Sequence, residues 1–271
     1  MRALLGAALA LCVAVGARAA EFAVLDADAV PHVKQDGRQS YARFATMNLP
    51  RAFAVSPDGA YGWQSGGGDA AWVRTKALEN CAAKGAKGCA LYAEDLRVVW
   101  PGKASVEPTK PPTAPLVPGR DFAIDTDQRY FWRGPAQARG LYVWGHGTGG
   151  GFDSRNAQPQ GHARHFNNAG FDIAKFNRDP GQDYPGPAAA FLRDALGQLC
   201  RQGWRTIVVA GQSRGAWNSL QMLSTPGLAD AVIGIAAASF SSNAGYGGQG
   251  AELYSLLSDA RLGRIGVAQQ R

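Results

Sequence analysis

The chain has 271 residues, a net charge of +7 and four cysteines. Its basic residues are dispersed, without a dense Lys and Arg run interleaved with aromatics, which argues against nucleic acid as a partner. Residues 1–19 combine a basic start, an apolar run and the small-residue sequence Ala17-Arg18-Ala19, a pattern typical of a secretory signal peptide. A membrane anchor is the alternative, but the run is shorter than the about 20 residues that a spanning helix needs. We therefore expect a secreted or periplasmic protein without a stable membrane anchor.

The number and spacing of the cysteines are consistent with export. Cys81 and Cys89 lie close together in the sequence, and their spacing does not match the short CxxC type of zinc site. In an oxidising compartment they are predicted to form a local disulfide, with two unpaired thiols as the alternative. Cys200 falls in an apolar helical pattern and is predicted to be a buried free thiol.

Residues 20–100 are predicted to form a small α+β module, whose role the sequence does not indicate. Apolar runs on either side of the Ser-Pro-Asp-Gly sequence at 56–59 predict a hairpin, because proline and glycine favour a tight turn. The glycine tract at 66–68 lacks the spacing of a phosphate loop and is interpreted as a flexible turn. The predicted elements are strands at 52–55, 61–63, 91–93 and 98–100 and a helix at 70–83.

Residues 101–120 are rich in proline, which fixes φ and removes backbone donors, so this segment is predicted to be an extended linker. Strands and helices then alternate over residues 121–271. Such alternation predicts a mostly parallel α/β sheet with flanking helices. The predicted strands lie at 122–124, 130–132, 140–144, 171–176, 206–210, 231–238 and 265–268, and the helices at 162–169, 188–200, 214–223 and 251–257.

A G-Q-S-R-G sequence at 211–215 joins one of these strands directly to a helix. The pattern is weak alone, but strand–turn–helix is the setting in which a nucleophilic serine is presented. A sharp turn leaves no room for side chains two residues on either side of the serine, which explains Gly211 and Gly215. Backbone strain points the hydroxyl out of the sheet, and the helix N-terminus favours negative charge. We predict that Ser213 is a nucleophile; an incidental serine in a glycine-rich turn is the alternative.

A glycine-rich loop at 145–151 follows the strand predicted at 140–144. Acyl transfer passes through an oxyanion that needs fixed backbone N–H donors, and losing one such donor costs roughly 3 kcal/mol. Glycines allow the backbone to approach a substrate closely. We predict an oxyanion hole formed by the backbone N–H of Arg214 with that of Gly147 or Thr148, and Gly149 as a further loop glycine. A phosphate-binding loop is disfavoured, because no G-K-[ST] sequence follows.

Residues 121–271 resemble the α/β-hydrolase superfamily in their order of elements and in two motifs, HGTGGG at 146–151 and GQSRG at 211–215. The loop resembles the HGGG-type oxyanion motif of secreted lipases and esterases. The resemblance implies a serine hydrolase with a triad in the order serine, acid, histidine. It also implies an acyl-enzyme on Ser213, a carboxylic ester as substrate in preference to an amide, and no metal or organic cofactor.

The chain departs from that pattern after Ser213, because all four histidines precede it: His32, His146, His162 and His165. The acidic residues that follow it, none of them predicted just past the end of a strand, are Asp230, Glu252 and Asp259. A serine hydroxyl is a poor nucleophile without an adjacent base. Three interpretations stay open. A hydrolase domain that is incomplete at its C-terminal end is favoured over a base from the 162–165 region and over a catalytically silent binding or interaction protein.

Overall fold

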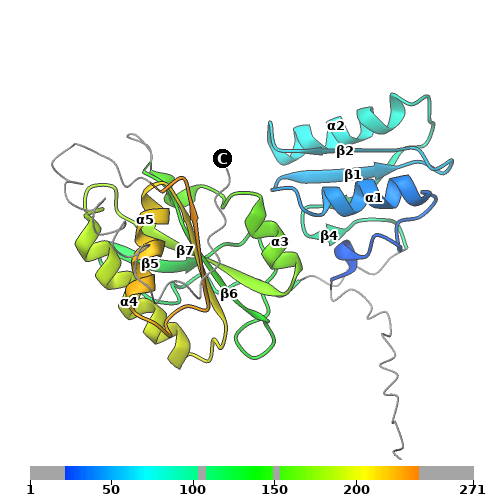
Figure 1. Ribbon diagram of the computed structural model, residues 1–271. Helices are drawn as coiled ribbons and strands as arrows, with labels where there is room; N and C mark the ends of the chain where they lie inside the picture. The colour runs from blue at the N-terminus through cyan, green and yellow to red at the C-terminus, as the bar shows by residue number, and fades with distance from the viewer. Residues whose placement is uncertain (1–21, 103–107, 149–152, 238–271) are drawn as a thin grey trace, which may run out of the picture.

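Two separate β-sheets, each with helices on its faces, organise the protein (Figure 1). The computed structural model describes residues 22–102, 108–148 and 153–237. The predicted signal peptide, the helix predicted at 251–257, the strand predicted at 265–268 and Gly149 lie outside these residues.

The first sheet is antiparallel, with the strand order β2-β1-β3-β4. Its strands are β1 (Arg51–Val55), β2 (Tyr61–Ser65), β3 (Ala90–Glu94) and β4 (Arg97–Val98), and its helices are α1 (Gln35–Phe44) and α2 (Ala70–Ala82). Successive side chains of a strand point to opposite faces. Ala52 and Ala54 therefore pack under α2, whereas Phe53 and Val55 pack with α1. The predicted hairpin is confirmed, and Gly59 makes its turn with a φ of 87°.

The second sheet has the strand order β5-β7-β6-β8-β9 and is mostly parallel, as predicted. Its strands are β5 (Phe122–Thr126), β6 (Gly140–Gly145), β7 (Phe171–Arg178), β8 (Ile207–Gln212) and β9 (Ala231–Ile235). Only β5, at one edge, runs antiparallel to its neighbour. Every residue of β6 is buried, which is typical of a parallel strand covered on both faces.

Helices cover both faces of this sheet. Helix α3 (His162–Asn168) lies on one face, and α4 (Pro185–Arg201) and α5 (Arg214–Gln221) lie on the other (Figure 1). Side chains of β6 alternate between the two layers, with Tyr142 and Trp144 toward α3 and Leu141 and Val143 toward α4. After β6 the chain continues to β7 on one side of that strand, whereas after β8 it continues to β9 on the other side of the sheet. The carboxyl ends of β6 and β8 thus flank a topological switch point, where sheets of this type bind ligands.

The prediction of a strand at 130–132 is wrong. The three aromatic side chains of this segment enter three different clusters: Tyr130 packs on the α3 side, Phe131 joins the core of the first sheet, and Trp132 meets Trp204. The side-chain amide of Asn167 bonds both the N–H and the carbonyl of Phe131, at 2.9 Å each, in place of a neighbouring strand. Tertiary anchoring therefore overrides the extended pattern that the sequence indicates.

The strand predicted at 231–238 is observed as β9, the edge strand of the described sheet, and its Ala231 and Gly234 are exposed. Cys200 is exposed rather than buried. The apolar stripe of α4 (Leu192, Leu196 and Leu199) faces the sheet, and Cys200 lies at the edge of that stripe, about 100° from Leu199, in the last turn of the helix.

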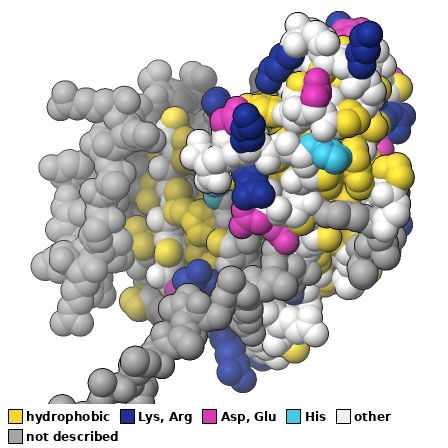
Figure 2. Space-filling view, turned by 90° about the vertical axis from the view of Figure 1, so that its right-hand side faces the viewer, with side chains coloured by type: hydrophobic (Ala, Val, Ile, Leu, Met, Phe, Trp, Pro, Cys, Tyr) yellow, Lys and Arg dark blue, Asp and Glu magenta, His cyan; other side chains and the backbone are white. Residues whose placement is uncertain are grey.

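The predicted disulfide between Cys81 and Cys89 is present and ties α2 to the segment before β3. None of the helices in the described ranges is long and apolar enough to cross a bilayer. On the face in Figure 2, basic and acidic side chains are interspersed rather than gathered into a patch of one sign.

Candidate functional site

Ser213 is the single residue between the end of β8 and the start of α5. Its φ of 51° and ψ of −116° are unusual for a residue with a side chain, so the turn is strained. The N–H of Ser213 donates to the carbonyl of Ile235 in β9 at 2.9 Å, and its carbonyl accepts from the N–H of Trp217 at 3.1 Å. Contacts on both sides of the peptide therefore hold the strained conformation in place.

The flanking glycines are required by backbone contacts. A Cβ on Gly211 would lie 2.3 Å from the carbonyl carbon of Gly215, and a Cβ on Gly215 would lie 2.1 Å from the carbonyl oxygen of Gly145. Backbone atoms at those distances leave no space for any side chain. The turn and the loop that follows β6 thus pack directly against each other, as the pairing of Gly145 with Gly211 requires.

The loop brings Gly147 beside the serine: a Cβ on Gly147 would lie 3.4 Å from the Cβ of Ser213. Ser213 is half-buried and Thr148 is exposed. The residues predicted to form an oxyanion hole, Gly147, Thr148 and Arg214, therefore all lie next to Ser213 or in the loop that contacts it.

His146 belongs to this loop but makes its hydrogen bonds with Gly147 and Arg178. Its Nδ1 lies 2.8 Å from the carbonyl oxygen of Gly147, and its Nε2 lies 3.4 Å from the backbone nitrogen of Arg178. A carbonyl can only accept, so Nδ1 carries the proton and Nε2 accepts. Burial, followed by the positive charge of Arg178, lowers the pKa of His146 to about 4. At neutral pH the ring is therefore uncharged, and both nitrogens are occupied by partners other than Ser213.

Two buried arginines lie beneath the loop and the turn. Arg178, at the end of β7, is 0 % exposed, and Arg214, at the start of α5, is 1 % exposed. Asp183 bridges them, with Arg178 Nε at 3.0 Å from Oδ2 and Arg214 Nη2 at 3.3 Å from Oδ1. Sequence reasoning missed Arg178 and Asp183. The sequence signal available for Arg178 was a basic residue just after the apolar strand predicted at 171–176.

The other histidines do not complete a triad. His162 Nε2 lies 2.7 Å from the hydroxyl of Tyr142, and burial, then His165, lowers the pKa of His162. The ring of His162 also packs edge-on against Trp144, with the ring centroids 5.1 Å apart, so its contacts are with side chains of β6. His32 lies with the first sheet, beside Trp100. In the described part of the chain, no hydrogen bond joins a histidine to Ser213.

The acidic candidates are also distant or undescribed. Asp230 accepts a hydrogen bond from the N–H of Ile207 at 2.8 Å, which places it at the amino end of β8. Ser213 lies at the opposite, carboxyl end. Glu252 and Asp259 lie outside the described residues.

The segment at 153–161, which precedes α3, is held by residues in or beside both sheets. The side-chain amide of Gln158 makes two hydrogen bonds of 3.0 Å with the backbone of Leu49, and Asn48 donates to the carbonyl of Pro159 at 3.1 Å. Lys175, from β7, donates to the carbonyl of Arg155 at 2.7 Å. This segment is therefore fixed from two sides.

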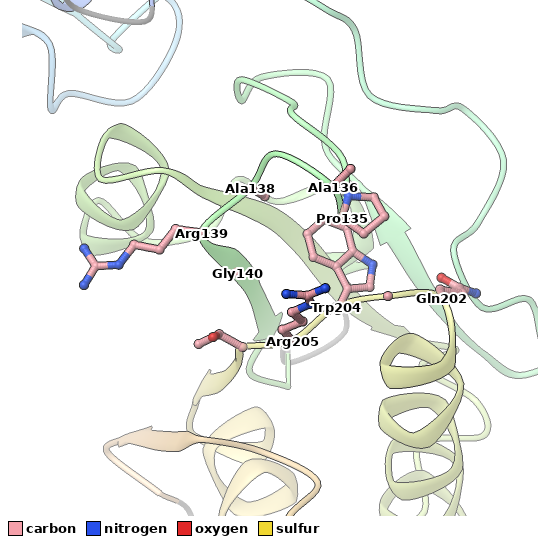
Figure 3. A pocket seen from close by; sticks show the side chains of 10 residues that line it. Pro135, Ala136, Ala138, Arg139, Gly140, Gln202, Trp204 and Arg205 are labelled. Atoms are coloured by element: carbon pink, nitrogen blue, oxygen red, sulfur yellow. The ribbon is translucent and has the colours of Figure 1, made fainter. Parts of the chain in front are cut away.

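A well-formed hollow in the described residues does not coincide with this site. It has a volume of about 580 Å³ and lies at the amino ends of β6 and β8, where Gly140, Trp204 and Thr206 line it. Figure 3 shows Trp204 beside Pro135, with Arg139 extending away from the indole. A second hollow, of about 210 Å³, lies between Asp95 and the proline-rich segment. Neither includes Ser213, so backbone geometry and not hollow size locates the candidate site.

No protein-family model matches this chain. No curated protein matches it either. The functional interpretation therefore rests on the local geometry that places Ser213, Gly147 and Arg214 together at the carboxyl ends of β6 and β8.

Proposed function

We propose that this chain is a serine hydrolase of the α/β-hydrolase superfamily, which cleaves a carboxylic ester, in preference to an amide, through an acyl-enzyme on Ser213. The observation that carries the proposal is the strained Ser213 between β8 and α5, with the backbone of Gly147 directly beside it. A strained serine at a strand-to-helix turn, next to a glycine-rich loop from a neighbouring strand, is the arrangement of the nucleophile in that superfamily.

The chemistry follows from these positions. The hydroxyl oxygen of Ser213 attacks the ester carbonyl carbon, its proton passes to the oxygen of the leaving alcohol, and negative charge develops on the carbonyl oxygen. The N–H groups of Arg214 and of Gly147 or Thr148 stabilise that charge. The C–O bond to the alcohol then breaks, the alcohol leaves with that proton, and water releases the acid from the acyl-enzyme.

A catalytically silent binding protein of the same architecture is the second candidate. The observation in its favour is that the histidines of the described residues make their hydrogen bonds elsewhere. Without a base, only the contribution of the oxyanion hole and of binding remains, roughly 10³–10⁴-fold over water. The two candidates therefore differ in whether Ser213 reacts at a measurable rate.

Labelling with a fluorophosphonate probe, read by mass spectrometry of the labelled peptide, tests the proposal. We expect labelling of Ser213 in the wild type, none in Ser213→Ala and wild-type labelling in Ser224→Ala, a matched control just beyond α5. Likewise, the wild type and Ser224→Ala should hydrolyse a short-chain nitrophenyl ester, and Ser213→Ala should not. Equal labelling of the wild type and Ser213→Ala overturns the nucleophile, and a folded wild type that neither labels nor hydrolyses esters supports the silent protein.

A further inference from the structure

Arg178 contacts the glycine-rich loop at three points although it lies on a different strand. Its Nη2 donates to the carbonyl oxygen of His146 and lies 3.4 Å from Nδ1 of that histidine, and its backbone N–H lies 3.4 Å from Nε2. The side chain is fully buried, so these contacts are made away from water. Arg178 thus fixes the direction of the first peptide of the loop.

That direction decides where the loop N–H groups point. In a trans peptide the carbonyl and the following N–H lie in one plane and point in opposite directions. The carbonyl of His146 faces Arg178, and the oxygen lies 2.6 Å from where a Cβ of Gly215 would be. The N–H of Gly147 therefore points away from both. The carbonyl of Gly147 is held by His146 Nδ1 in the same way, which fixes the N–H of Thr148.

Asp183 connects this loop to the turn. Its Oδ2 pairs with Arg178, and its Oδ1 pairs with Arg214, the residue whose backbone N–H is the other predicted oxyanion donor. Arg214 Nη2 also donates to the backbone carbonyl of Asp183 at 3.2 Å. Buried guanidinium groups are stable only with hydrogen-bonded partners of opposite charge. One carboxylate therefore contacts both cations and links the arginine that holds the loop to the arginine of the turn.

We propose that Asp183 and Arg178 are positioning residues that hold the oxyanion hole in its working geometry, an inference that rests on the proposed esterase function. They contact no substrate and act through the peptides of His146 and Gly147 and through Arg214. Because the oxyanion forms only in the transition state, a loosened hole lowers kcat and leaves KM nearly unchanged.

The test is Asp183→Asn, which keeps the size of the side chain and removes its charge. We expect kcat for a nitrophenyl ester to fall on the order of 10- to 100-fold with KM within about twofold of wild type, because complete loss of one donor costs roughly 10²–10³-fold and a displaced donor costs less. Asp179→Asn is the matched control: this carboxylate lies in the same connection, pairs with Arg155 and should leave kcat unchanged. The proposal is overturned if a folded Asp183→Asn has the wild-type kcat, or if the substitution raises KM without lowering kcat.

Arg178→Lys carries the test if Asp183→Asn does not fold. A single ammonium cannot contact Asp183 and the carbonyl of His146 together, so we expect kcat to fall about 10-fold with the fold retained. An unchanged kcat in this variant contradicts the proposal.

Hydrogen exchange separates the inference from the proposed function. The amides at 146–148 and 213–216 should exchange at least about 10-fold faster in Asp183→Asn than in wild type, but not in Asp179→Asn. If the wild type hydrolyses no ester, the proposed function fails while the exchange result still decides whether Asp183 holds the loop. Unchanged exchange at both segments refutes that role.

Discussion

Acid should destabilise this protein through His146. Burial and the Arg178 charge lower its pKa to about 4 in the folded state, and the more distant carboxylates of Asp183 and Asp153 only partly oppose this. The unfolded chain has a histidine pKa of about 6.5. Between these values the unfolded state binds more protons, so the free energy of unfolding falls as the pH falls. At up to about 1.4 kcal/mol per pH unit, the loss reaches about 3 kcal/mol near pH 4 and vanishes above pH 6.5.

Urea unfolding at a series of pH values from 7.5 to 4 measures this loss. His146→Asn is the informative variant, because the asparagine amide still donates to the carbonyl of Gly147 and does not titrate. The wild type should lose about 3 kcal/mol more than His146→Asn over this range. His165→Asn, at an exposed histidine of α3, should follow the wild-type curve. If the wild type and His146→Asn lose stability in parallel, His146 is not held uncharged by its surroundings and the reasoning is refuted.

Three further changes test the packing around the site. Gly215→Ala should lower the free energy of unfolding by about 1–3 kcal/mol and abolish labelling of Ser213, because the new Cβ meets the Gly145 carbonyl oxygen. Gly186→Ala is the control: it has open space around it and should be neutral by urea unfolding. Replacing Cys81 and Cys89 by serine should lower the free energy of unfolding by about 2–3 kcal/mol, and an unchanged midpoint would contradict this. Gln158→Ala should speed proteolysis within 153–161, because both hydrogen bonds to Leu49 are lost; Gln160→Ala, whose side chain makes no such pair among the described residues, should not.

The sequence predicts the two sheets and the serine turn well because their signals are local. The apolar runs that become β6 and β8 are continuous, and glycines mark the turn where no side chain fits. Helix α1 escapes prediction, because it buries only Gly37, Tyr41 and Phe44 and the rest of it is polar. A pattern of so few apolar positions does not distinguish a helix from a loop.

Contacts between distant residues explain what the sequence could not indicate. Arg178 and Asp183 resemble ordinary charged residues at the end of a strand and in a loop. Their burial depends on α5 and the glycine-rich loop lying above them, which only the assembled sheet determines. In the same way, Tyr130, Phe131 and Trp132 form an extended pattern in the sequence, but each side chain belongs to a different cluster.

The serine turn and the loop are therefore one structural unit rather than two motifs that happen to be near each other. Gly215 and Gly145 are in contact at the backbone, and the Asp183 carboxylate joins the arginine of the turn to the arginine that holds the loop. A change in either part must move the other, because no flexible side chain lies between them to absorb it. The strain at Ser213 and the direction of the loop N–H groups are thus set together, because both follow from the pairing of β6 with β8.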